Sequence, residues 1–298
     1  MFKNILVPLD GSNLSEASLG PAAYLAKKLR SQVTLFHVIE QGAPSEIHKE
    51  RHLTQPEEAD AYLKEVAKRF FPANVEVKTH VHTAAVSNVA FSIVDHTPDL
   101  NSDLIVICTH GRGGVRDLLY GSIAQQVVAM GTIPLLVIKT KNPSFELKKI
   151  LVPLDPDSIH DASLDVAESL AKTFKAELHL FSVIPTLSTL GDEQSAAGNL
   201  MPATTKAYLD LKVENVKKDL QNHIDALHKG DLIATAEVAR GDPVLLIIKA
   251  AEQSETDLII LSTHRKAGMG AFWARSVAPK VAQKTKTPLL LIPLSQNE

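Results

Sequence analysis

Cysteine is nearly absent from the chain, which contains a single one, Cys108, in 298 residues. A lone cysteine excludes an internal disulfide, and its place in a predicted buried strand favours core packing over redox chemistry. Excess charge is absent too: the formal net charge is −3, and no stripe of Lys and Arg with interleaved aromatic residues occurs. This composition argues against nucleic acid as the main partner.

Long hydrophobic runs are also missing, so no segment has the length needed to cross a bilayer. The N-terminus, MFKNILVPLDGS, reaches a polar turn too early for a secretion signal. We therefore expect a cytoplasmic protein without a membrane partner. The chain does have enough residues, 45% of them hydrophobic, for two domains with complete cores.

One stretch, residues 103–139, combines an apolar run, a glycine-rich loop, a helical pattern and a second apolar run. A glycine loop that leads into a helix can direct several backbone N–H groups at one anion, and phosphate is the obvious guest. The alternative is that these glycines only turn the chain at the end of a strand, because short glycine patterns often match by chance.

An internal repeat organises the whole chain. Residues 2–39 align without a gap with residues 147–184, and both segments contain ILVPLD; residues 103–139 align with residues 257–293. The chain is therefore interpreted as a tandem duplication, with domains at 1–141 and 147–298.

Each copy alternates predicted strands and helices. In the first copy the patterns predict strands at 4–9, 32–39 and 75–81, and helices at 12–29, 57–70 and 84–95, before the glycine-loop stretch. The second copy predicts strands at 148–154, 177–183, 233–238, 257–262 and 289–292, and a long helix at 203–228 that follows a polar segment at 186–201. This alternation predicts an α/β fold of two Rossmann-like domains, each a five-stranded parallel sheet with helices on both faces.

The motifs ILVPLDGS and THGRGG…YGS resemble those of the universal stress protein family in its tandem two-domain form. The resemblance covers both halves and implies a five-stranded parallel fold of the adenine nucleotide alpha hydrolase-like type. One branch of this family binds ATP through Gly, two residues, Gly, nine residues, then Gly with Ser or Thr. Gly111 and Gly121–Ser122 match the second and third anchors, but Cys108 replaces the first glycine.

The resemblance implies an ATP site in the first domain. Pro8 and Asp10 would lie beside the ribose and phosphates, and the backbone of Val38 would meet the adenine edge. The remaining residues implied to contact phosphates are Gly111, Arg112, Gly113, Gly114, Gly121, Ser122 and Ile123. The order of the elements agrees, since ligands of open α/β sheets bind beyond the carboxyl ends of the strands.

The second copy departs further from the motif, because Arg265 and Arg275 stand where the first copy has Gly111 and Gly121. Bulky side chains there would keep backbone away from phosphate, so we expect one nucleotide per chain. A Gly-x-Pro that many relatives carry after the third strand is present as Gly241–Pro243, whereas the first copy is read there as Thr83–Val86.

Other polar residues are weaker candidates. Asp10 could orient ribose or Mg²⁺ or cap the following helix, and a capping role is favoured for Asp155. His110 and His264 are expected to be structural. His80 and His82 lie on one strand face without an evident third ligand, so no metal site is predicted.

Catalysis has little support, since no lysine lies in or next to the glycine loop and no kinase motif occurs. A nucleotide-dependent switch is the leading interpretation; an interaction module that has lost ATP binding and a weak ATP hydrolase remain alternatives. The apolar final strands, 135–138 and 289–292, should not stay unpaired, so the two copies are expected to pair with each other, with a further homodimer possible.

Overall fold

The computed structural model describes residues 1–43, 46–47, 50–109, 122–139, 145–156, 162–190, 196, 198–263 and 277–294. The elements of the first copy are β1 (Asn4–Pro8), α1 (Asn13–Glu16), α2 (Leu19–Leu29), β2 (Gln32–Glu40), β3 (Glu46–Ile47), β4 (Glu50–Arg51), α3 (Pro56–Phe70), β5 (Val77–Val86), α4 (Val89–Asp99), β6 (Leu104–Thr109), α5 (Ser122–Met130) and β7 (Leu135–Lys139).

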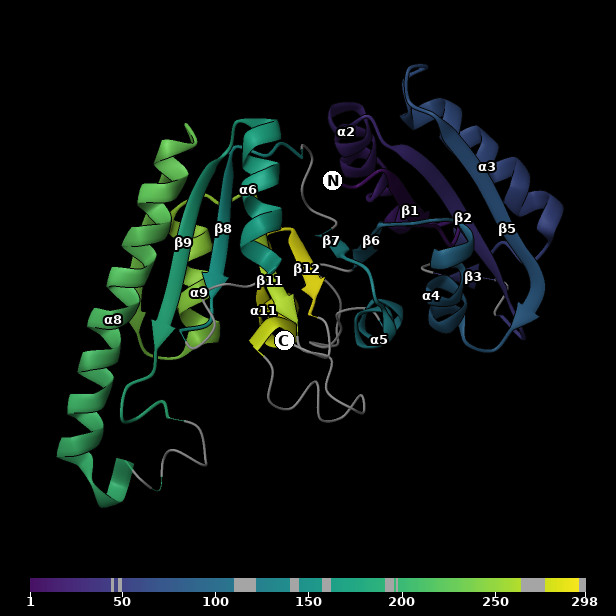
Figure 1. The fold of residues 1–298 in the computed structure, drawn as a ribbon. Coiled ribbons are helices and arrows are strands. Elements are labelled where there is room, and N and C mark those ends of the chain that lie inside the picture. Colours follow the sequence, from purple (N-terminus) through teal and green to yellow (C-terminus); the bar gives the residue numbers. More distant parts are fainter. Residues whose placement is uncertain are drawn as a thin grey trace. The chain divides into compact units, whose positions relative to one another are not determined.

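Five strands of the first copy form a parallel sheet in the order β7-β6-β1-β2-β5. Helices α2 and α3 pack together on one face, and α4 and α5 pack together on the other (Figure 1). The inner strands are apolar on both faces because both faces are covered; Ile5, Leu6 and Val7 of β1 are at most 1% exposed. The expected doubly covered parallel sheet is confirmed.

The second copy repeats this plan. Its elements are β8 (Lys149–Leu154), α6 (Ala162–Phe174), β9 (Glu177–Ile184), α8 (Pro202–Lys229), β10 (Ala234–Arg240), α9 (Pro243–Gln253), β11 (Leu258–Thr263), α11 (Val277–Lys284) and β12 (Leu289–Pro293). Strands β10, β9, β8 and β11 follow one another in a parallel sheet. Helix α8 packs on β9 and β10, and α9 packs on β9 and α11.

The last strand of the second copy pairs with the last strand of the first. Strand β12 runs antiparallel to β7, with Leu290 opposite Leu136. By its contacts, β12 belongs to the compact unit that contains the first half of the chain, whereas residues 147–262 and α11 form the other unit. The expected pairing of the two apolar strands is confirmed, and it protects the edge of β7.

The duplication is visible in side-chain contacts at the amino ends of the strands. Asp103 accepts hydrogen bonds from the backbone N–H groups of Lys3 and Asn4, at 2.6 and 2.9 Å. Asp257 accepts the corresponding bonds from Lys148 and Lys149, at 2.9 and 2.8 Å. One carboxylate in each copy thus ties two neighbouring strands together at their amino ends.

Two predicted helices differ from the observed ones. The helix expected at 12–29 is broken between α1 and α2, because Pro21 has no N–H to donate to Ala17 and so interrupts the helical ladder. The helix expected at 84–95 begins only at Val89, since β5 continues to Val86, which pairs with Glu40. The sequence therefore predicted the start of the first helix but not its interruption, and it placed the start of the second helix too early.

Candidate functional site

The turn after β1 is built around Asp10. Its Oδ1 accepts hydrogen bonds from the backbone N–H of Ser12 at 2.9 Å and from the Ser12 hydroxyl at 2.6 Å. The same hydroxyl caps α1 by accepting the N–H of Ser15 at 3.2 Å. Among the residues that the structure describes, Oδ2 of Asp10 has no hydrogen-bond partner. One carboxylate oxygen of Asp10 therefore orders the turn after β1.

Gly11 makes this turn possible. Its φ is +91°, a conformation that residues with a Cβ rarely adopt, and a Cβ there would lie 2.8 Å from the Leu53 side chain. Pro8, which the family pattern places beside the ribose, ends β1 and is partly exposed. The chain thus leaves β1 with Asp10 held close to the carboxyl end of the strand.

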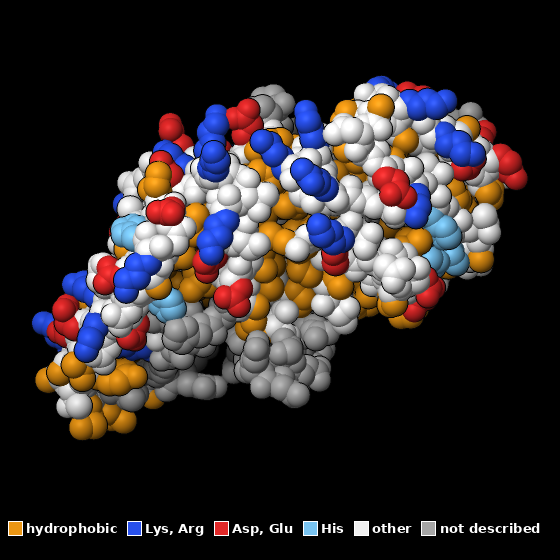
Figure 2. Space-filling view, turned by 45° about the horizontal axis from the view of Figure 1, so that its top comes forward, with side chains coloured by type: hydrophobic (Ala, Val, Ile, Leu, Met, Phe, Trp, Pro, Cys, Tyr) orange, Lys and Arg blue, Asp and Glu red, His pale blue; other side chains and the backbone are white. Residues whose placement is uncertain are grey.

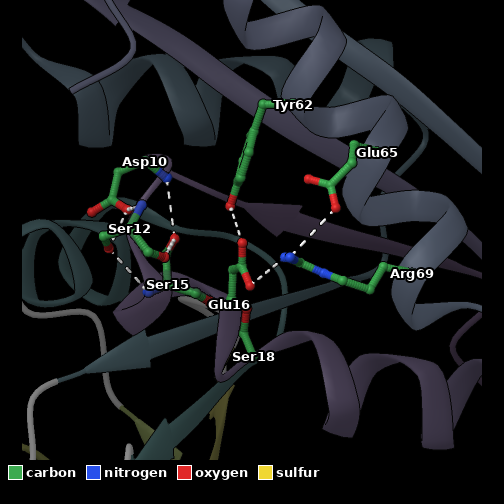
Figure 3. Close-up of polar contacts among 8 residues, drawn as sticks. All are labelled: Asp10, Ser12, Ser15, Glu16, Ser18, Tyr62, Glu65 and Arg69. Atoms are coloured by element: carbon green, nitrogen blue, oxygen red, sulfur yellow. Dashed lines mark hydrogen bonds and ion pairs between the residues drawn. The ribbon is translucent and has the colours of Figure 1, made fainter. Parts of the chain in front are cut away.

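Side chains of α3 hold helix α1 through Glu16 (Figure 3). The Tyr62 hydroxyl donates to Glu16 Oε1 at 3.2 Å, and Arg69 Nη2 donates to Glu16 Oε2 at 2.5 Å. Burial and the neighbouring Glu16 carboxylate raise the pKa of Tyr62, so this hydroxyl stays protonated and remains a donor. These three side chains form a clamp that fixes α1, which starts three residues after Asp10.

The carboxyl end of β2 lies next to this turn. His37 is buried, and its Nδ1 and Nε2 lie 2.7 and 3.0 Å from the backbone carbonyl oxygens of Leu9 and Leu53. Val38, the residue proposed to face adenine, is 6% exposed and pairs with His82. The ladder to β5 becomes irregular between Val38 and Glu40, as often happens beside ligand sites.

Strands β6 and β7 add groups that sequence reasoning missed. Lys139 ends β7, is 5% exposed, and stands opposite Thr109 of β6. Burial lowers the pKa of Lys139 to about 8. The pKa of Cys108 is raised to about 12, chiefly by burial, with Lys139 and Asp10 close enough to act on it. In the sequence, the one feature that marks Lys139 is that it is a cation directly after the apolar run LLVI.

Most of the predicted phosphate contacts lie outside the described residues. These are Gly111, Arg112, Gly113, Gly114 and Gly121. Four other residues singled out from the sequence also lie outside the described ranges: His110, His264, Arg265 and Arg275. Helix α5 does begin at Ser122, as expected for a helix that follows the glycine loop, and Ile123 in its first turn is partly exposed.

The histidines of β5 form a cluster with α4. The ring of His96 lies 5.6 Å from that of His80 and 4.7 Å from that of His82, measured between centroids. Burial first, and His96 second, lowers the pKa of both His80 and His82. In the described ranges no group of three or more His, Cys, Asp or Glu side chains is arranged to hold a metal ion.

The surface carries mixed charge. On the face shown in Figure 2, acidic and basic side chains are interspersed, and neither sign forms a continuous patch there. None of the helices in the described part of the chain is both long and apolar enough for a membrane span.

The second copy differs at the equivalent positions. Asp155 follows β8 and is exposed, and Pro293 stands where the first copy has Lys139. Asp242 caps α9 through the N–H of Leu245, with Gly241 at φ +147° before it. Since Asn88 caps α4 in the same way, the first-copy equivalent of Gly241–Pro243 is residues 87–89, so the alignment with Thr83–Val86 was wrong.

Two α/β units of parallel strands, with polar residues at the carboxyl ends of the strands, define the chain as a tandem Rossmann-like protein. The family model described as "Universal stress protein family" matches residues 1–139 and 146–293. The chain therefore belongs to the universal stress protein family.

Similar proteins cover one copy or both. Universal stress protein Sll1654 of Synechocystis is 30% identical over 138 residues, which are 46% of this chain and 86% of that protein. The universal stress protein E homolog of Haemophilus influenzae is 24% identical and covers 100% of this chain and 99% of its own length. A universal stress protein structure from Archaeoglobus fulgidus has a TM-score of 0.71 at 17% identity, covering 99% of this chain and 97% of its own.

Proposed function

We propose that the chain is a stress-response protein that binds ATP in its first domain (1–141) and acts as a nucleotide-dependent switch or interaction module. The observation that carries this proposal is the strand order β2-β1-β6, which brings the ends of three strands to one edge of the sheet. Val38, Asp10 and the start of the glycine loop therefore lie on neighbouring strands, where open α/β sheets bind ligands.

The proposal gives each residue of the site a role. Val38 would meet adenine through its backbone, and Pro8 and Asp10 would line the ribose and phosphates, with Oδ2 of Asp10 also able to hold Mg²⁺. The glycine loop would offer backbone N–H groups to the phosphates through Gly111, Arg112, Gly113, Gly114, Gly121, Ser122 and Ile123.

Cys108 is the main departure from the ATP-binding motif. Its thiol lies 3.7 Å from the carbonyl oxygen of the next residue, Thr109, and so contacts the backbone of its own strand. The thiol is partly buried, and its raised pKa keeps it uncharged, which avoids repulsion of a phosphate. Cys108 is therefore compatible with nucleotide binding in this proposal.

The second domain (147–298) is proposed to bind no nucleotide, because arginines replace its two loop glycines. Nucleotide would act on the first domain by stabilising one arrangement of the glycine loop, in proportion to its differential affinity for the two arrangements. We assign the protein to the cytoplasm, with other proteins rather than nucleic acid as partners, and include a homodimer of the whole chain as part of the proposal.

The sharpest test places an arginine in the first loop. Gly121→Arg should abolish ATP binding measured by isothermal titration calorimetry, because the side chain would occupy the space for phosphate. The matched control is Arg275→Gly in the second copy, which should leave the stoichiometry at one nucleotide per chain. Unchanged binding by Gly121→Arg would refute the first-domain site.

Two alternatives are separated by further measurements. Absence of nucleotide from freshly purified protein and in titrations would favour an interaction module that has lost ATP binding. Phosphate release that disappears in Asp10→Asn, and persists in Asp155→Asn, would favour a weak hydrolase. Asparagine is preferred to alanine here, because its side-chain oxygen still accepts the bonds from Ser12.

A further inference from the structure

Three histidine rings meet where β5 and α4 come together. His80 and His82 are two residues apart on β5, so their side chains leave the same face of the sheet. His96 reaches them from α4, with its ring 5.6 Å from that of His80 and 4.7 Å from that of His82, measured between centroids. All three side chains are partly exposed, so protons from solvent can reach the cluster.

His96 has one ring nitrogen at which it can gain a charge. Its Nδ1 lies 2.7 Å from the carbonyl oxygen of Ser92. Because a carbonyl oxygen can only accept, Nδ1 carries a hydrogen and donates, and a further proton goes to Nε2. His96 also lies in the last turn of α4, where the end of a helix favours a positive charge.

A charge on His96 acts on the two histidines of β5. Burial first, and His96 second, lowers the pKa of His80 and of His82; His82 lowers the pKa of His80 further, and Asp95 of α4 raises the pKa of His82. The neighbour from β2 is the uncharged ring of Phe36, 5.5 Å from His80 and 5.1 Å from His96. Helix α3 also packs on β5, but from the opposite face of the sheet, which it covers together with α2.

The second copy has no histidine at any of the three equivalent positions. These positions lie opposite the same points of the neighbouring strand and equally far from the helix cap, and they hold Glu237, Ala239 and Ala250. The same fold therefore forms without the cluster, which is a feature of the first copy alone.

Helix α4 connects the cluster to the elements of the proposed site. It packs on β2 and on α5. Strand β2 carries Val38, which stands opposite His82, and α5 begins at Ser122, directly after the glycine loop. A change in how α4 is held therefore reaches both elements.

We propose that His80, His82 and His96 form an acid sensor of the first copy, in which repulsion between charged rings loosens α4 from the sheet. Because the pKa values of His80 and His82 are lowered, the unfolded chain binds more protons than the folded one as the pH falls below the ordinary histidine value of 6.5. The stabilisation that the neutral cluster gives is present above that pH and is lost in acid. The sensor goes beyond the proposed function; only its effect on adenine binding at Val38 rests on that proposal.

The experiment follows hydrogen exchange of the α4 amides in the full chain by mass spectrometry, corrected for the intrinsic pH dependence of exchange. From about pH 7 to about pH 5, where histidine gains its charge, protection of residues 89–99 should fall about tenfold, the value of one pKa unit. The equivalent helix of the second copy, α9, should keep its protection.

Two variants isolate the cluster. The double variant His82→Gln, His96→Asn leaves one of the three histidines and keeps a side-chain donor near the Ser92 carbonyl, so the loss of protection should shrink to less than about twofold. The matched control is His179→Gln in the second copy, because the ring of His179 lies beside Phe181 rather than beside another histidine. This control should show the same loss in α4 as the wild type.

The outcomes separate the sensor from the proposed function. Equal loss of protection in α4 and α9, or a loss that the double variant retains, would overturn the sensor. Adenosine is the probe for the adenine site, since it has no phosphate to titrate; its affinity should fall in acid for the wild type and not for the double variant. Wild-type affinity that does not change with pH would overturn the link to Val38. If adenosine and ATP are not bound at any pH, the nucleotide site is refuted, while the exchange of α4 still decides the sensor.

Discussion

At the scale of single residues, the buried Lys139 at the end of β7 costs stability. Burial lowers its pKa from 10.5 to about 8. A lowered lysine pKa means that the folded protein disfavours the charged form, and the difference corresponds to about 3 kcal/mol of destabilisation below pH 8. Groups held at such a cost are found at functional sites more often than elsewhere.

Lys139→Met should therefore stabilise the protein without nucleotide. At pH 7 we expect a gain of about 1–3 kcal/mol in the free energy of unfolding, measured with urea. Between pH 8 and 10.5 the unfolded wild type binds more protons than the folded one, so wild-type stability rises with pH and the gain should shrink. Cys108, the titratable neighbour of Lys139, is present in both proteins and acts to raise the lysine pKa. A variant less stable than wild type at pH 7 would contradict this account.

Sequence reasoning found some site residues and missed others for identifiable reasons. Asp10 and Val38 follow strongly apolar runs, so their place at strand ends could be predicted. The two hydrogen bonds that Asp10 accepts from Ser12 could not be predicted, because the bond from the Ser12 hydroxyl depends on Gly11 adopting φ +91°. Lys139 was missed because a cation at the end of a strand usually extends into solvent, and only the tertiary structure shows that it is buried.

At the scale of elements, strands were more predictable than helix starts. Buried strands have continuous apolar runs, whereas the start of a helix depends on local competition. Pro21 split the first helix, and the ladder with β2 kept Val86 in β5 despite the helix-favouring alanines before it. The cap at Ser12 has a direct mechanism, because a serine oxygen before a helical pattern accepts a free backbone N–H.

The clamp between α1 and α3 gives a prediction at this scale. Tyr62→Phe should lower the free energy of unfolding by about 0.5–1.5 kcal/mol, since it removes one bond to Glu16 and leaves Arg69 in place. In a double-mutant cycle with Arg69→Met, the two changes should be non-additive by at least 0.5 kcal/mol, as expected for groups that share one carboxylate.

The control for the clamp is an exposed ion pair on the same helix. Lys64 and Asp60 are separated by 2.7 Å, but their side chains are 62% and 43% exposed. Lys64→Met should therefore change stability by no more than about 0.5 kcal/mol and be additive with Tyr62→Phe. Additive effects of Tyr62→Phe and Arg69→Met would mean that the three side chains do not act as one unit.

At the scale of the whole molecule, the two copies depend on each other through one strand pair. Strand β12 comes from the second copy, yet it pairs with β7 and groups with the first unit. Leu135, Leu136, Val137 and Ile138 of β7 are each at most 3% exposed. Without β12 this apolar edge would present unpaired N–H and C=O groups, which favours association between chains.

Removing β12 should therefore change the assembly as well as the stability. A chain that ends at Pro288 is expected to form larger oligomers or to aggregate, as measured by light scattering after size-exclusion chromatography, and to unfold at a lower temperature. A chain that ends at Leu294 keeps β12 and is the control; it should behave like the full chain. If both truncated chains kept the wild-type oligomeric state and unfolding temperature, β12 would not be needed to cover β7. The duplicated second half would then contribute something other than the closure of the first sheet.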